Sequence, residues 1–151
     1  MDANRLIKWI AIIVLAILAW KYAMPWAKQQ MGRHGTPAAA AESSCTAAAQ
    51  RASEAWGSGL HRFVNPPYDL GAWSSFRSDV DAKIAAAESE CRASSLSNDA
   101  ARAAMSDLRN LVGDLDTAIR NGSPPPDDAV QRQEAIDTKI EAAAELARSG
   151  K

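Results

Sequence analysis

Residues that could carry out catalysis are few in this chain of 151 residues. His34 and His61 are its only histidines, and neither has a Cys or a second His at metal-ligand spacing. Zinc and haem motifs need such ligands at short, fixed separations, so the sequence predicts neither site. A nucleophilic serine needs a base and a third group to orient it, and no serine has that setting. We therefore expect a protein that is not an enzyme and that holds no metal or cofactor.

The acidic residues form close pairs along the sequence. These pairs are Asp79/Asp81, Glu88/Glu90, Asp114/Asp116 and Asp127/Asp128. Residues one or two positions apart point to different faces of a helix. A carboxylate-bridged metal centre would need inward Glu and Glu-x-x-His pairs, which the sequence lacks. We therefore expect these carboxylates to be solvated surface groups.

Cys45 and Cys91 are the only cysteines, and each lies on an apolar stripe with helical spacing. The stripes are Ala41, Cys45, Ala49, Ala52, Trp56, Leu60 and Phe63, then Trp73, Phe76, Val80, Ile84, Ala87 and Cys91. In an antiparallel hairpin that pairs residues whose numbers sum to 136, Cys45 faces Cys91 and Phe63 faces Trp73. Every stripe residue from Cys45 to Phe63 then has an apolar partner. This register predicts a disulfide, and two buried, reduced cysteines are the alternative.

The turn of that hairpin lies in FVNPPYDLGAW, residues 63–73, within an aromatic cluster. Five aromatic residues fall close together there: Trp56, Phe63, Tyr68, Trp73 and Phe76. One interpretation is that all of them except Tyr68 close the end of the protein core. The other is a surface that binds a partner, because aromatic and Arg residues are common interface anchors. The candidate partner-binding residues are Arg62, Tyr68, His61, Trp56 and Trp73, of which we expect Arg62 and Tyr68 to be exposed.

The elements that position these residues are predicted to be helices, because alanine is abundant and β-branched runs are few. Their ends are marked by Thr36-Pro37, Pro66-Pro67, Asp69, Ser97 as N-cap, Asn121-Gly122, Asp127 or Asp128, and Gly150. We predict helices over about 37–64, 70–94, 98–120 and 127–148. Short turns join them, so we expect an all-α, up-down antiparallel four-helix bundle of two hairpins.

The second hairpin has apolar stripes of its own. They are Ala101, Met105, Leu108, Val112, Leu115 and Ile119, then Val130, Gln133, Ile136, Ile140, Ala143 and Ala147. Gln133 is a polar interruption, which either fixes the register of the last helix or lies at the edge of its stripe.

The N-terminal segment LIKWIAIIVLAILAWKYAMPW, residues 6–26, is typical of a transmembrane helix. Its uninterrupted apolar run of twelve residues reaches spanning length once the stems of flanking Lys8 and Lys21 are included. The residues expected at the membrane interfaces are Lys8, Trp9, Trp20, Lys21, Tyr22 and Trp26. We predict a membrane anchor over 1–26, a linker over 27–36 and a helical domain over 37–150. The alternatives are a cleaved signal peptide and a buried helix that meets no membrane.

Net charge is −1 and hides an asymmetry. Residues 1–36 hold five basic residues and one acidic residue, net +4, whereas the remainder holds 12 basic and 17 acidic residues, net −5. An acidic body argues against binding to nucleic acid, where contacts to phosphates dominate the affinity. Disulfides persist in oxidising compartments, so we expect a single-pass inner-membrane protein with a cytoplasmic N-terminus and a periplasmic C-terminal domain.

Together these features predict a non-enzymatic interaction or scaffold protein of the bacterial envelope. We expect it to bind the membrane through its N-terminal helix and a protein partner through its aromatic end, and homo-oligomerisation stays open. One alternative is a ligand-binding sensor with a pocket at the aromatic end. A phage or secretion accessory protein of the envelope is the other.

Overall fold

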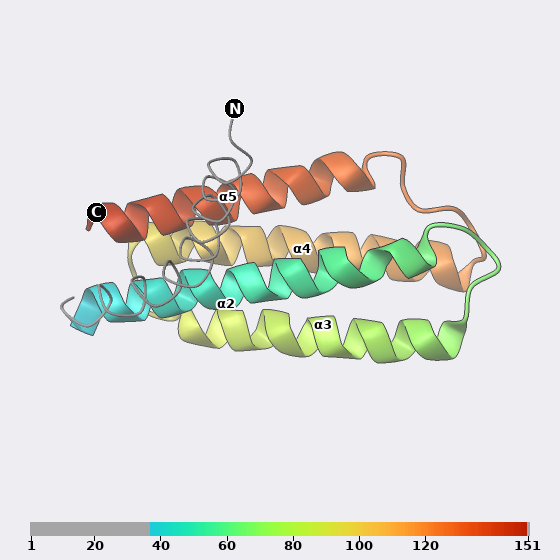
Figure 1. Ribbon diagram of the computed structural model, residues 1–151, viewed down its shortest axis with the longest axis horizontal. Coiled ribbons are helices and arrows are strands. Elements are labelled where there is room, and N and C mark those ends of the chain that lie inside the picture. Colours follow the sequence, from blue (N-terminus) through green and yellow to red (C-terminus); the bar gives the residue numbers. More distant parts are fainter. Residues whose placement is uncertain (1–36, 151) are drawn as a thin grey trace, which may run out of the picture. The chain divides into compact units, whose positions relative to one another are not determined.

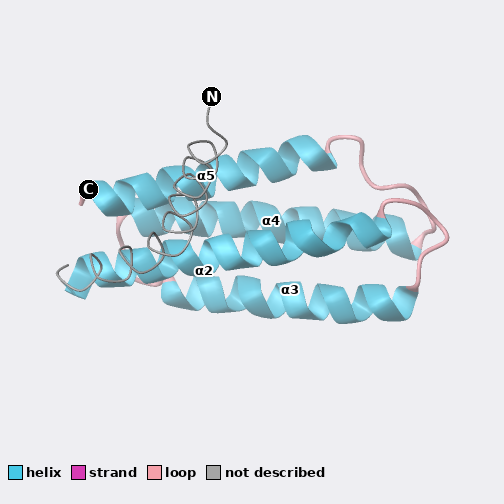
Figure 2. Cartoon of the chain, viewed as in Figure 1, coloured by secondary structure: helices cyan, strands magenta, loops and turns pink. Residues whose placement is uncertain are grey.

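The computed structural model describes residues 37–150, which form four α-helices and one turn of 3-10 helix. The elements are α2 (Pro37–Leu60), η2 (His61–Phe63), α3 (Leu70–Glu90), α4 (Leu96–Arg120) and α5 (Ala129–Ser149) (Figure 1). This part of the chain contains no strand (Figure 2). The predicted all-α fold with four helices is therefore confirmed.

The predicted anchor and linker lie outside the described residues, and with them all six residues expected at the membrane interfaces. Within residues 37–150, no helix combines the length and the apolar character that a membrane crossing needs.

The four helices run antiparallel to their neighbours in sequence, and α2 packs against all three of the others (Figure 1). The α2–α3 and α4–α5 connections lie at one end of the bundle, and the α3–α4 turn lies at the other (Figure 1). We call the end formed by residues 61–70 and 121–130 the tip.

Three of the eight predicted helix bounds are those observed, at residues 37, 70 and 120, whereas α2 ends at Leu60 instead of 64 and α5 begins at Ala129 instead of 127. Asp69 caps α3, since its carboxylate accepts a hydrogen bond from the backbone N–H of Ala72 at 2.9 Å. Gly122 has a φ of 64° just after α4, and Gly150 has a φ of 66° after α5. Both values lie in the left-handed region that glycine adopts without a steric penalty.

The predicted cap of α4 was wrong by two residues. Ser95 is the N-cap, and its hydroxyl accepts a hydrogen bond from the backbone N–H of Asn98 at 3.1 Å. Ser97 is buried inside the first turn and donates its hydroxyl to the backbone oxygen of Ala143 in α5, at 2.9 Å. Either serine can cap a helix, and this tertiary contact selects Ser95 by drawing Ser97 into the core.

Helix α3 also ends earlier than predicted, at Glu90. Arg102 of α4 donates a hydrogen bond to the backbone oxygen of Cys91 at 2.7 Å. The bond satisfies one of the carbonyl groups that a helix leaves free at its C-terminus. The chain therefore turns immediately after the second cysteine.

The core is thin and rich in alanine, and the predicted stripes of α3 and α4 are buried throughout. Two stripe positions were wrong. Ala41 is exposed in the second turn of α2, and Val130 is 68% exposed in the first turn of α5. At the start of α5 the neighbouring residue Ala129 faces inward instead.

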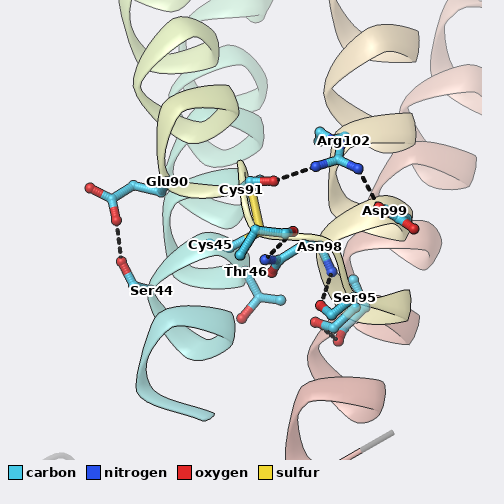
Figure 3. The surroundings of a disulfide bond; sticks show 12 residues. Ser44, Cys45, Thr46, Glu90, Cys91, Ser95, Asn98, Asp99 and Arg102 are labelled. Carbon is cyan, nitrogen blue, oxygen red and sulfur yellow. Dashed lines mark hydrogen bonds and ion pairs between the residues drawn. A yellow bond between two sulfur atoms is a disulfide. The ribbon is translucent and has the colours of Figure 1, made fainter. Parts of the chain in front are cut away.

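The predicted disulfide is confirmed. Cys45 and Cys91 are bonded, with Cα atoms 4.7 Å apart, and neither has any exposed surface. Next to the disulfide, Ser44 donates a hydrogen bond to the carboxylate of Glu90 at 2.6 Å (Figure 3). The cysteines are 46 residues apart, which corresponds to about 4 kcal/mol in the chain-entropy model.

Candidate functional site

Four aromatic rings from α2, η2 and α3 pack together next to the tip. They belong to Trp56, Phe63, Trp73 and Phe76, and neighbouring ring centroids are 5.1–6.3 Å apart. Phe63 meets Trp73 edge to face, as the predicted register requires. Trp56 is 0% and Trp73 is 1% exposed. These two tryptophans, predicted as partner-binding candidates, therefore belong to the core and offer no surface to a partner.

Gly59 is what allows the cluster to pack against α2. A Cβ atom built on Gly59 would lie 2.1 Å from Cε2 of Phe76 and 2.7 Å from its Cδ2 and Cζ atoms. The edge of the Phe76 ring therefore rests on the backbone of α2. Glycine is the only residue without a Cβ, so no other residue leaves room for this contact.

Arg62 lies over the outer side of the cluster. Its side chain is exposed, and the Cζ atom is 5.5 Å from the centroids of both Phe63 and Phe76. Nε donates a hydrogen bond to the backbone oxygen of Gly59 at 3.4 Å. The guanidinium is thus held by two aromatic rings and one carbonyl group.

Asp116 of α4 is the polar support of the cluster. Its carboxylate accepts hydrogen bonds from Trp73 Nε1 at 2.8 Å and from Arg120 Nε at 2.9 Å, and Arg77 NH1 lies 2.5 Å away. Partial burial would raise the pKa of Asp116, but the hydrogen bonds from Trp73, Arg120 and Arg77 outweigh it and lower the pKa below the ordinary value. The carboxylate therefore stays charged and fixes α3 against α4.

The sequence did not reveal this role of Asp116. We expected the Asp114/Asp116 pair to be solvated, and this is correct for Asp114, which is 55% exposed. Asp116 is only 14% exposed. Its spacing of four residues from Arg120 was a signal for a local ion pair. Nothing in the spacing indicated that Trp73 and Arg77 would approach from the other hairpin.

Tyr68 joins the two turns of the tip. Its ring packs against the core, and its hydroxyl donates a hydrogen bond to the backbone oxygen of Ser123 at 3.0 Å. We expected Tyr68 to be exposed, and it is partly buried. Tyr68 fixes the turns relative to each other and leaves Arg62 and His61 as the exposed members of the predicted set.

Exposed apolar side chains are concentrated on the tip, which the sequence did not reveal. Among the described residues, the large hydrophobic side chains that are exposed are Val64 at 49%, Leu70 at 53%, Leu96 at 63% and Val130 at 68%. Val64, Leu70 and Val130 belong to the tip, and only Leu96 lies at the opposite end. Helical periodicity could not find Val64 and Leu70, because they flank the turn where the period stops.

Polar side chains also join α2 to α5. Ser53 of α2 donates to Asp137 at 2.5 Å and accepts a hydrogen bond from Gln133 at 2.7 Å, so Gln133 joins α5 to α2. This contact supports the interpretation in which Gln133 fixes the register of α5. No three His, Cys, Asp or Glu side chains of this region lie together as a metal site would require. That the whole protein has no catalytic activity, metal or cofactor stays a prediction.

A scan against protein-family models found no match to this chain, and neither did searches of curated proteins and of solved structures. What the chain does must therefore be inferred from its own residues.

Proposed function

We propose that this chain is a membrane-tethered interaction module of the bacterial envelope that binds a protein partner with its tip. The observation that carries the proposal is the placement of Val64, Leu70 and Val130, exposed at the same end of the bundle as Arg62. Contiguous apolar patches rimmed by polar residues mark protein-binding surfaces, and we infer that these three side chains contribute to one. Arg is enriched among the residues that dominate binding energy.

The way the tip is built supports this role. Tyr68 joins its two turns, Asp116 joins α3 to α4, and the packed rings lie directly beneath. A surface held in one conformation loses little entropy when it binds. The tip is therefore pre-organised for a partner of matching shape.

The tether in the proposal rests on the sequence of residues 6–26, and the location rests on the disulfide. Structural disulfides persist outside the cytoplasm. We therefore place the N-terminus in the cytoplasm and the bundle in the periplasm. Helix α2 has 24 residues, and at ~1.5 Å per residue it carries the tip roughly 36 Å from its own first residue.

Site-specific photocrosslinking in the cells that make the protein tests this function. A photoreactive amino acid replaces Val64 or Leu70 in the full chain, and Leu96 is the matched control because it is similarly exposed at the opposite end. We expect a covalent adduct with one protein from positions 64 and 70 and none from position 96. Equal adducts from all three positions, or none from the tip, would contradict the proposal.

The sensor alternative is not favoured by the described residues. It requires an apolar pocket ringed by Trp56, Trp73 and Phe76, whereas these rings pack against one another. No observation in residues 37–150 favours the phage or secretion accessory over other envelope roles.

A further inference from the structure

The charge of Arg62 has no counter-charge in the described part of the chain. Eight of the 11 basic residues within 37–150 lie in ion pairs with Asp or Glu. The three that do not are Arg51, Arg62 and Arg92. In a bundle where most cations are paired, these three are candidates for an anion from outside.

Arg62 differs from Arg51 and Arg92 because its guanidinium is already oriented. The rings of Phe63 and Phe76 hold it, each with its centroid 5.5 Å from the Cζ atom. Nε is directed to Gly59, and the two terminal nitrogens have no hydrogen-bond acceptor within residues 37–150. These contacts leave the N–H groups of the two terminal nitrogens free to donate to an acceptor from outside.

We propose that Arg62 anchors the tip to its partner by binding a carboxylate, supplied by an Asp or Glu flanked by apolar residues. This inference rests on the proposed function and adds the chemistry of the partner. Two parallel hydrogen bonds from a guanidinium fit the two oxygens of a carboxylate. Apolar side chains beside that carboxylate would cover Val64 and Leu70 and exclude water, which strengthens the ion pair.

The charges around Arg62 favour a single carboxylate over a polyanion. The tip also carries Asp69, Asp127 and Asp128, so acidic groups outnumber Arg62 at this end of the bundle. A phosphorylated or nucleic-acid partner would be repelled by these carboxylates, and a surface of anionic lipid would be repelled as well. One carboxylate within an apolar segment keeps the attraction of Arg62 and adds little repulsion.

The test repeats the photocrosslinking from position 64 of the full chain in variants of Arg62. Arg62→Gln removes the charge and keeps a planar polar group, whereas Arg62→Lys keeps the charge and loses the paired donors. We expect the adduct to fall at least about tenfold with Arg62→Gln and by less with Arg62→Lys. The matched controls Arg51→Gln and Arg92→Gln should leave it unchanged. Far-UV circular dichroism on each purified variant confirms that the helices are retained.

Mass spectrometry of the adduct then identifies the contact. We expect an Asp or Glu of the partner within a few residues of the attached position, and reversal of that acid to Arg should restore binding to Arg62→Glu. An adduct that persists unchanged in Arg62→Gln would overturn the role of Arg62 and leave the proposed function intact. An adduct with lipid or with a second copy of this chain would overturn the partner's chemistry. Loss of the wild-type adduct at positions 64 and 70 would overturn both proposals.

Discussion

Gly59 and Gly57 form a matched pair for testing how the aromatic cluster packs. Both lie near the end of α2, two residues apart. A Cβ on Gly59 would meet Phe76 at 2.1 Å, whereas a Cβ on Gly57 would have no atom within 4 Å. Replacing each by alanine therefore makes the same chemical change in a filled and in an open environment.

The expected magnitudes follow from these distances. Alanine in place of a helical glycine stabilises a protein by about 0.5–1 kcal/mol, and both variants gain this term. Gly59→Ala also requires the Phe76 ring to move, and three other rings hold it in place. Such overpacking costs about 1–3 kcal/mol. Subtracting one variant from the other removes the shared helix term, so Gly59→Ala should be about 1–3 kcal/mol less stable than Gly57→Ala.

Urea unfolding of the full chain in detergent, followed by far-UV circular dichroism, measures this difference. In thermal unfolding of the same samples, at about 4 °C per kcal/mol for a domain of this size, the midpoints should differ by roughly 4–12 °C. Near-UV circular dichroism should weaken in Gly59→Ala, because the packed tryptophans lose their fixed environment. Equal stability of the two variants would refute the contact between Phe76 and the backbone of α2.

Three further predictions concern contacts between the helices. Asp116→Asn should destabilise the protein at pH 7 by about 1–3 kcal/mol, whereas the exposed control Asp114→Asn should cost at most about 1 kcal/mol. The pKa of Asp116 is lowered in the folded state, so its stabilisation is present above the ordinary value of 3.8 and is lost as the pH falls further. Urea titrations from pH 7 to pH 3 should therefore show the gap between wild type and Asp116→Asn narrowing below about pH 4; a constant gap would contradict this. Tyr68→Phe should lower the free energy of unfolding by about 0.5–1.5 kcal/mol, and it should speed amide hydrogen exchange in residues 121–128. Unchanged exchange in those residues would argue against the hydrogen bond to Ser123. Replacing both Cys45 and Cys91 by Ala should lower the free energy of unfolding by about 2–5 kcal/mol. An unchanged urea midpoint would show that the disulfide adds no stability.

Much of the first hairpin could be predicted from sequence because two kinds of evidence agreed. Helical spacing placed Phe63 opposite Trp73, and the same register placed Cys45 opposite Cys91. A single register pairs the large rings with each other and the two cysteines with each other. Shifting one helix along the other would break all of these pairs, so the register is well determined. The turn then followed from Pro66 and Pro67, which cannot continue a helix.

Features that depend on contacts between residues far apart along the chain could not be predicted. Ser97 was assigned as a cap because its local pattern suits one, yet its hydroxyl bonds to Ala143 in α5. Asp116 was assigned to the surface because only Arg120 was visible as a local partner. Tyr68 was assigned to the surface because Ser123, which its hydroxyl binds, belongs to the other hairpin. Each needed the position of a residue more than forty places away along the chain.

The proposed function requires the bundle to lie outside the cytoplasm. The most direct test is to measure the redox state of Cys45 and Cys91 in the cell. Cells are quenched with acid, the denatured protein is treated with a large maleimide reagent, and its shift on a gel is compared before and after reduction. We predict no modification before reduction and two added groups after it. The single variant Cys45→Ala provides the control, because its lone Cys91 should react without reduction. Modification of both cysteines in unreduced wild-type protein would contradict the disulfide and the location that follows from it.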